Sequence, residues 1–495
     1  MGYDIDYLAL APEITLAVTA MVVLSLDLVL TRQHKYWTAI AAVLGVGFSA
    51  FPLITLAVSD TEVRSMFDGS YVVDDFALVL KALFIAAGYL VLLMSVQYIE
   101  SDRYYQGEYY FLVLMSILGS VVMASARDLI ILFIGLELVS GSLFLLAGWR
   151  KGDARSNEAS LKYFLLGVLS AAILLYGMSL LYGTTGSITF DGIREASVGL
   201  TDEPIFVLAV LFVVIGFAFK VSAVPFHFWA PDTYEGAPTP ITAYLSVSSK
   251  AAGFVGLLMI TYQALPEASH IWGPALWVMA VLSMTVANLT ALRQNNIVRL
   301  LAYSSVAQAG FMLVPFAVAG VSSEPDALST AFSATITYLI IYAFMNLGAF
   351  AIVIAGARRT QTGDIDGWAG FGRYAPGLGI LAAIFFFSLA GIPPLAGWYA
   401  KFVMFNAALG GGSWWTGVLA AIAAVNAVIA FYYYARIIKT IWMDEAPEPI
   451  GGDDQPVVGS LRLALILSAA VVVIAGFFPD VINFYSETTR LLALG

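Results

Sequence analysis

Long apolar runs follow one another along almost the whole chain, and short polar connections separate them. Each run has about 20 residues, the length that spans ~30 Å of hydrocarbon as a helix. The runs are continuous and do not alternate, which favours helices over the strands of a membrane barrel. We therefore predict fourteen membrane spans, with soft edges, at 10–30, 38–58, 76–99, 109–124, 127–148, 160–183, 205–229, 240–263, 274–292, 297–318, 328–356, 376–409, 415–441 and 459–478.

Two of these spans contain residues that break helices. The seventh reads FAFKVSAVPFHFWAP and includes Pro225, and the twelfth reads FFFSLAGIPPLAGWYAKF and includes Gly391, Pro393 and Pro394. Proline has no backbone N–H and its ring clashes with the preceding turn, so both helices should be interrupted. Interrupted helices at corresponding places in two halves of a chain indicate a transport site.

The positions of the breaks also predict a repeat. Spans four to eight form one block of five and spans nine to thirteen another, and the broken helix is the fourth in each. Because five is odd, the second block starts on the opposite side of the membrane, which makes the blocks inverted repeats. The predicted fold is an all-α integral membrane protein with a three-helix segment at 1–108, repeats at 109–263 and 274–441, and an acidic loop with the last span at 442–495.

Composition supports a membrane protein and excludes several function classes. The chain is 60% hydrophobic and 12% charged, whereas a soluble domain carries about 25% charged residues. The absence of cysteine excludes cysteine-ligated iron–sulfur clusters and thiol catalysis in this chain. No basic cluster indicates nucleic-acid binding. We predict no metal ligands and no cofactor-binding residues. The string GLGILA at 377–382 is dinucleotide-like by its letters, but it lies inside a span with no preceding strand.

Basic residues in the connections predict the orientation, because cytoplasmic loops carry an excess of Lys and Arg. The side of the N-terminus has Arg64, Arg127, Arg194 and Arg490. The opposite side has Arg32, Lys35, Arg103, Arg150, Lys151, Arg155, Arg293, Arg299, Arg358, Arg359, Arg373, Arg436, Lys439 and, just inside a span, Arg462. The second side should therefore be cytoplasmic, and an even number of spans then places both termini outside.

Four charged residues, Glu137, Lys220, Lys250 and Lys401, lie well inside predicted spans. A charge at membrane depth costs roughly 2.5–3.5 kcal/mol even on the lenient insertion scale. Burial disfavours the charged form of a lysine and a nearby carboxylate favours it, so moving a counter-ion can switch its charge, as a proton relay requires. The alternatives are a protonated glutamic acid that bonds helix to helix, lysines that reach back to the interface, and solvation of Lys250 by its small polar neighbours.

Other polar residues are harder to assign from position alone. Lys162, near the start of its span, is as easily explained by reaching to the interface as by function. Lys81 follows Asp75 by two turns and should be a salt-bridged interfacial lysine. His227, in the broken seventh span, is either a structural histidine or a proton carrier.

A polar stretch in the tenth span contains Ser304, Ser305 and Gln308. These side chains either line a hydrated path or bond helix to helix. The Trp and Tyr clusters at 414–415 and 432–434 are interpreted as interfacial belts.

Three strings make the chain resemble a known family, the antiporter-like subunits of respiratory complex I (proton-pumping NADH:quinone oxidoreductase), which are similar to subunits of Mrp-type cation/proton antiporters. They are KVSAVPFHFWAPDTYEGAPTP at 220–240, RLLAYSSVAQAGFM at 299–312 and SLAGIPPLAGWYAKF at 388–402. Within the family, Lys401 stands where the M-type usually has Glu, and the long C-terminal extension of the L-type is missing. The chain therefore resembles the bacterial N-type.

The resemblance implies that a proton relay runs through Glu137, Lys162, Lys220, Lys250 and Lys401, with His227 as a further candidate. It implies proton translocation driven by redox chemistry in other subunits, and no cofactor in this chain. The expected partners are other membrane-arm subunits, including further antiporter-like ones, and the expected location is the bacterial cytoplasmic membrane with both termini periplasmic. The alternatives are a subunit of an Mrp-type antiporter or membrane-bound hydrogenase, and a scaffold that pumps nothing.

Overall fold

The computed structural model describes residues 5–59, 63–100, 107–322, 325–446 and 456–488. The N-terminal segment contains α1 (Ala11–Val29), η1 (Arg32–His34), α2 (Tyr36–Ser59), β1 (Arg64–Met66), β2 (Tyr71–Val73) and α3 (Asp75–Glu100). The strands form an antiparallel hairpin in which Ser65 pairs with Val72. This segment thus has three long helices and a short hairpin that the apolar runs did not indicate.

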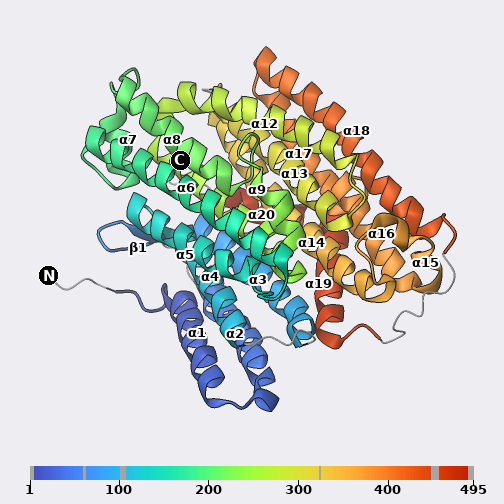
Figure 1. The fold of residues 1–495 in the computed structure, drawn as a ribbon. Coiled ribbons are helices and arrows are strands. Elements are labelled where there is room, and N and C mark those ends of the chain that lie inside the picture. Colours follow the sequence, from blue (N-terminus) through green and yellow to red (C-terminus); the bar gives the residue numbers. More distant parts are fainter. Residues whose placement is uncertain (1–4, 60–62, 101–106, 323–324, 447–455, 489–495) are drawn as a thin grey trace.

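Two groups of helices follow. The first contains α4 (Gly107–Ser125), α5 (Leu129–Ala147), α6 (Ala154–Thr185), α7 (Phe190–Ser197), α8 (Pro204–Lys220), α9 (Trp229–Gly236), α10 (Thr239–Tyr244), the π-helical η2 (Leu245–Ser249), α11 (Lys250–Leu258), the π-helical η3 (Met259–Ala264) and η4 (Pro266–Ala268). The second contains α12 (Ser269–Ala291), α13 (Ile297–Ala319), α14 (Pro325–Thr360), η5 (Ile365–Trp368), α15 (Phe371–Tyr374), α16 (Pro376–Ala390), α17 (Ala396–Gly410) and α18 (Trp414–Trp442). The helices α19 (Gly459–Phe477) and α20 (Asp480–Thr488) complete the fold (Figure 1).

The predicted membrane helices are present, and both predicted breaks occur. In the described part of the chain, twelve helical stretches are long and apolar enough to cross a membrane, and α8 and α16 are shorter apolar helices. These two are the first halves of the predicted broken spans: α8 ends at Lys220 and α16 at Ala390. Each break contains a cis peptide bond, before Pro225 and before Pro394. The all-α membrane fold is confirmed, while the exact number of crossings and the repeat boundaries stay predictions.

The connections gather at two opposite ends of the helices. At one end, Tyr71 of the hairpin pairs with Ala126, and Asp128 pairs with Thr189, which brings the connections around β1 and α7 together (Figure 1). At the other end, Asn296 pairs with Asp364, and the Arg436 guanidinium donates to the Gln294 carbonyl oxygen. This grouping matches the two sets of loops that the alternation of spans predicted. Arg103, Arg490, both termini and part of the acidic loop lie outside the described residues.

Polar contacts hold α1 against the rest of the molecule at both of its ends. Lys81 of α3 lies 2.7 Å from Glu13, its side chain fully buried, and the Tyr71 hydroxyl donates to the same Glu13 oxygen at 2.6 Å. At the far end, Asp27 accepts from Lys35 at 2.7 Å and from the backbone N–H of Gly107, where α4 begins, at 3.1 Å. Lys81 is salt-bridged as predicted, but to Glu13 of another helix. Because apolar contact alone does not drive helices together in lipid, such polar contacts help to fix their positions.

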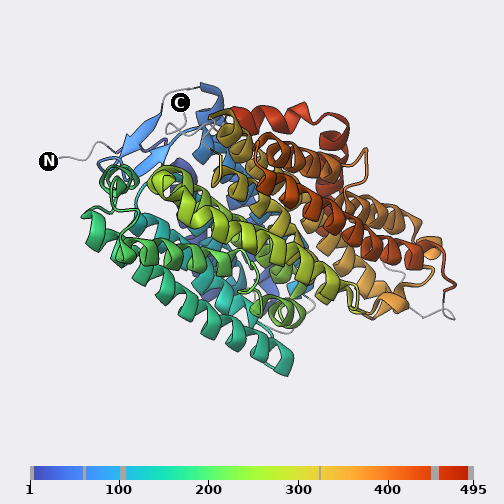
Figure 2. The ribbon, with the colours of Figure 1, turned by 90° about the horizontal axis from the view of Figure 1, so that it is seen from above.

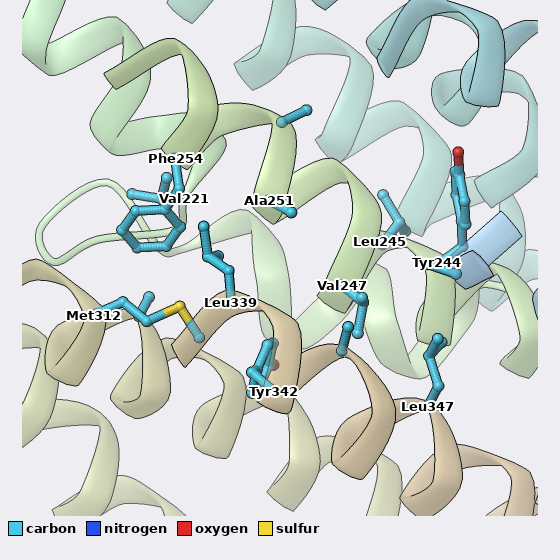
Figure 3. Packing of buried hydrophobic residues seen from close by; sticks show 14 of the residues in the cluster. Val221, Tyr244, Leu245, Val247, Ala251, Phe254, Met312, Leu339, Tyr342 and Leu347 are labelled. Atoms are coloured by element: carbon cyan, nitrogen blue, oxygen red, sulfur yellow. The ribbon is translucent and has the colours of Figure 1, made fainter. Parts of the chain in front are cut away.

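The two groups of helices share one buried interface. The break between α8 and α9, with α11, packs against α13 and α14, and Figure 3 shows Val221, Phe254, Met312 and Leu339 packed together there. Figure 2 shows the green helices α6–α8 and the orange helices α16–α18 on opposite sides of the molecule. Every residue from Pro240 in α10 to Ala264 in η3 is buried. The interface between the groups is therefore the place where buried polar groups from both can meet.

We predict that Glu13 and Lys81 stabilise the fold only as a pair. Lys81→Met should lower the free energy of unfolding by about 3–5 kcal/mol, because it leaves an uncompensated buried carboxylate. The double variant Glu13→Gln/Lys81→Met removes both charges and should recover most of the melting temperature. The measurement is thermal unfolding in detergent, with Lys439→Met, which removes an exposed ion pair, as a control. A Lys81→Met variant that melts like the unmodified chain would contradict this.

Candidate functional site: a buried chain of cations

The first cation site lies at the break between α8 and α9. Lys220 is the last residue of α8, and its Nζ donates to Glu137 Oε1 at 3.0 Å and to Ser140 Oγ at 2.7 Å. Glu137 and Ser140 lie one turn apart on α5, so one helix face supplies both acceptors. Lys220 is 4% exposed and Glu137 28% exposed. The structure thus pairs the two charges that the sequence singled out, within a segment of irregular backbone.

Aromatic packing and two hydrogen bonds hold this break in place. The Trp229 ring, at the start of α9, stacks on Phe219 at 5.3 Å and on Tyr163 of α6 at 4.6 Å. Its indole N–H donates to the Phe219 carbonyl oxygen at 3.3 Å, and the Val224 N–H donates to Ser283 of α12 at 2.9 Å. Backbone groups that the interrupted helix leaves without partners are therefore bonded by neighbouring side chains, as irregular backbone at membrane depth requires.

The second cation site joins the two groups of helices. Lys250 is buried where η2 passes into α11, and its Nζ donates to the Ser305 carbonyl oxygen at 2.6 Å and to Ser305 Oγ at 2.5 Å. Ser305 belongs to α13. Among the described residues, no carboxylate forms an ion pair with Lys250 within salt-bridge distance. The ammonium of Lys250, in the first group of helices, is thus hydrogen-bonded to neutral acceptors of Ser305, in the second group.

A glycine brings the first and second sites close together. A Cβ placed on Gly253 would lie 3.0 Å from Lys220 Cβ and 2.9 Å from Val221 Cγ1. Any larger residue would push α11 away from the end of α8. Gly253 lies one turn after Lys250, so this close approach places both lysines at the same break.

The third cation site is built by the two prolines of the second break. The carbonyl oxygens of Leu389 and Ala390 would normally accept from residues 393 and 394, but both of these are proline and have no N–H. Instead, Lys401 donates to the Ala390 oxygen at 2.6 Å, and Gln308 donates to the Leu389 oxygen at 3.1 Å. The proline pair therefore leaves carbonyl acceptors free beside a lysine.

Two further features shape the third site. Lys401 Nζ lies 5.3 Å from the centre of the Phe311 ring, a cation–π distance. Gly391, at the end of α16, has φ +88°, and a Cβ there would lie 2.7 Å from Lys401 Cδ. The lysine stem thus occupies the space that a side chain at position 391 would fill.

A hydrogen-bonded network lies between the second and third sites, next in sequence to Ser305 of one and Ala390 of the other. The hydroxyls of Ser304 and Tyr434 are bonded to each other, and Gln308 donates to the Tyr434 hydroxyl at 3.4 Å. The Tyr338 hydroxyl donates to Gln308 Oε1 at 2.6 Å. With the bond from Gln308 to the Leu389 oxygen, a polar chain runs from α13 through α18 to the break before α17. Ser304, Ser305 and Gln308 bond helix to helix and lie between the two lysines.

One interpretation from the sequence is wrong. The cluster at 432–434 is not a simple interfacial belt, because Tyr433 and Tyr434 are buried and only Tyr432 is exposed. The sequence of an apolar helix with clustered aromatic residues does not reveal which face contacts lipid. The neighbouring Asn426, which bonds to Asn288 of α12, was a signal that this helix has a polar inner face.

Lys162 and His227 lie outside this network of buried lysines and hydrogen bonds. Lys162 is 42% exposed and pairs with Glu158 at 2.7 Å and with Asp232 of α9 at 2.7 Å. Asp232 also accepts from Arg299 at 3.0 Å, so this ion cluster lies on the predicted cytoplasmic face. His227 is buried in the first break, and its Nδ1 has no hydrogen-bond partner among the described residues. Their roles in a relay stay predictions.

The sequence matches a known family of membrane proteins. A family model described as NADH:quinone oxidoreductase/Mrp antiporter, transmembrane, matches residues 126–429, which include all three cation sites. The chain belongs to this family. It is 39% identical over 488 residues to NADH-quinone oxidoreductase subunit N of Trichlorobacter lovleyi, covering 97% of this chain and 96% of the relative. The resemblance to N-type subunits is therefore confirmed.

Solved structures of family members share the fold. A chain in respiratory complex I from Thermus thermophilus is 31% identical, with a TM-score of 0.76, covering 95% of this chain and 98% of that one. A chain in the Mrp complex from Dietzia is 19% identical, with a TM-score of 0.84, covering 98% and 97%. At that identity the second likeness shows the fold alone.

We predict that Glu137 and Lys220 act as one unit. Glu137→Ala and Lys220→Ala should each reduce NADH-driven proton uptake by membrane vesicles, because each leaves its partner's charge buried alone. The double variant should be little worse than either single variant, with a coupling energy of about 1–3 kcal/mol. Ser140→Ala, which removes only a neutral acceptor, is the matched control and should cost less. Fully multiplicative losses would show that the two residues work separately.

Proposed function

We propose that this chain is a proton-translocating membrane-arm subunit of NADH:quinone oxidoreductase (respiratory complex I). The observation that supports this most is the run of three buried lysines beside two broken helices, with a hydrogen-bonded network between the second and third. The named relatives are subunits of that enzyme. In this proposal, NADH, flavin, clusters and quinone belong to other subunits, and this chain carries only protons.

The acceptors at the second and third sites suit a lysine that gains and loses a proton. A backbone carbonyl oxygen accepts a hydrogen bond from a neutral amine as well as from an ammonium, so the contacts of Lys250 and Lys401 survive in either state. A charged lysine there is stabilised only by dipoles and remains costly. At the first site Glu137 stabilises the ammonium instead. A proton on Lys220 is therefore held more firmly than one on its neighbours, unless Glu137 moves or is itself protonated.

The proposed relay is Glu137, Lys220, Lys250 and Lys401, with Lys162 and His227 as peripheral members. The partners are neighbouring membrane-arm subunits, some of them antiporter-like, in the bacterial cytoplasmic membrane. We also propose that residues 109–263 and 274–441 are inverted repeats and that both termini are periplasmic. The likeness to the Mrp complex chain keeps a cation/proton antiporter as the second candidate, since both share this fold. A non-pumping scaffold would not need lysines buried on neutral acceptors.

We predict that Lys401 needs a proton that can leave and not merely a positive charge. Lys401→Arg keeps the charge but holds its proton above pH ~12. It should reduce NADH-driven proton uptake nearly as much as Lys401→Ala, by roughly 100-fold in the transfer step, since positioned proton transfer contributes about 10²–10⁴-fold. Lys401→Glu titrates and should retain more.

The measurement for Lys401 is proton uptake per NADH oxidised in vesicles that contain the assembled complex. Blue native electrophoresis verifies assembly, and Lys439→Arg, at an exposed position, is the matched control. Full pumping by Lys401→Arg would show that a fixed charge suffices, and the relay role of Lys401 would have to be abandoned.

We predict that the face carrying β1 and α7 is periplasmic. The chain contains no cysteine, so single cysteines can be introduced without background. A cysteine at Ser65 should react with a membrane-impermeant maleimide in whole spheroplasts, because it lies in the exposed hairpin. A cysteine at exposed Gln361, at the other end, should react only after lysis. The opposite pattern would reverse the orientation.

A further inference from the structure

A hydrogen-bonded network lies between the second and third sites, but among the described residues no hydrogen bond links the first site to the second. Gly253 brings the backbones of the two sites together, yet within the described ranges the side chain of Lys220 bonds only to α5 and that of Lys250 only to Ser305. Two tyrosine side chains lie in this interval, Tyr163 of α6 and Tyr234 of α9. Both are buried.

The two hydroxyls have neighbours at both ends of the interval. The Tyr163 hydroxyl interacts with the Ser249 hydroxyl and lies within electrostatic reach of Glu137 and of Tyr234. The Tyr234 hydroxyl lies close to Ser305, the residue that accepts from Lys250. The two hydroxyls therefore lie near each other, with Glu137 of the first site on one side and Ser249 and Ser305 at the second site on the other.

The Tyr234 hydroxyl has no hydrogen bond of normal geometry among the described residues. A buried hydroxyl left in this way destabilises the fold, because it has lost its hydrogen bonds to water without replacing them. Packing alone does not require the hydroxyl of Tyr234. Phenylalanine would keep the contact between its ring and that of Trp229, whose centres lie 6.0 Å apart. A hydroxyl at this point both donates and accepts a hydrogen bond, which phenylalanine cannot do.

We propose that the hydroxyls of Tyr163 and Tyr234 carry protons between the first and second cation sites, an inference that rests on the proposed function. Each phenol oxygen takes up a proton from one side while its own O–H proton passes to the next acceptor. The O–H bond that breaks is thus replaced by the one that forms, and no charge stays on the ring. The proton leaves the first site and arrives on the amine of Lys250, with a bound water bridging any step longer than a hydrogen bond.

The experiment compares three variants that each remove one hydroxyl: Tyr234→Phe, Tyr163→Phe and Tyr262→Phe. Tyr262 is the matched control, because it is buried, its hydroxyl also lacks a partner, and its ring packs against Phe316 and Phe332. It lies about 18 Å along the helix from Lys250, at 1.5 Å per residue. Each variant is studied in the assembled complex, and Lys250→Ala is the reference for a blocked relay.

We expect all three phenylalanine variants to assemble. Tyr234→Phe and Tyr262→Phe lose a hydroxyl that has no partner among the described residues and should melt at or above the temperature of the unmodified complex, whereas Tyr163→Phe loses its contact with Ser249 and should melt slightly below it. Proton uptake per NADH should fall about tenfold or more in Tyr234→Phe and Tyr163→Phe, below the typical 10²–10⁴-fold of positioned transfer because water can partly substitute, and should stay normal in Tyr262→Phe. The slowing of proton uptake in D₂O should increase in the first two variants only, which a purely structural role would not cause.

The outcomes separate the two levels of the argument. Normal pumping by Tyr234→Phe, or equal losses in all three variants, would overturn the role of the hydroxyls while a blocked Lys250→Ala upholds the proposed function. Normal pumping by Lys250→Ala would overturn the proposed function itself, and this inference with it.

Discussion

The constraint on which this structure depends is the cost of a positive charge in hydrocarbon. Lys220, Lys250 and Lys401 are all buried at membrane depth, where an ammonium without acceptors is unstable. A continuous helix uses its own carbonyl oxygens and has none to offer. The fold therefore places the lysines where helices are interrupted or where a neighbouring helix supplies an acceptor.

The three sites meet this constraint in different ways. The first uses a carboxylate and a hydroxyl from one face of α5. The second uses the carbonyl oxygen and hydroxyl of one serine, and the third uses a carbonyl oxygen freed by proline. Only the first compensates charge with charge, so the sites differ in how firmly they hold a proton.

The same reasoning explains the N-terminal segment. Helices in lipid gain little from apolar contact with one another, and α1 exposes much of its surface. Its two buried carboxylates, Glu13 and Asp27, bond to α3 and to the start of α4. Polar contacts thus position α1, just as they link the two groups of helices at Lys250.

The sequence by itself determined the class of fold and the main charged residues, because both follow from local chemistry. Apolar runs long enough to cross a bilayer predicted helices, and Pro225 and the proline pair at 393–394 predicted the breaks, since a missing N–H acts within one turn. Charges inside apolar runs identified Glu137, Lys220, Lys250 and Lys401 without any knowledge of their neighbours.

Only the tertiary structure decided which groups meet. Glu13 and Lys81 are far apart in sequence, and nothing local indicates that they pair. Tyr234 and Tyr434 are ordinary aromatic residues of apolar segments until packing turns their hydroxyls toward Ser305 and Ser304. An apolar helix in a membrane protein has no hydrophobic face that marks the inside, because lipid and protein interior are equally apolar. Periodicity therefore carries no signal for the inner face, and the polar path appears only when the helices are assembled.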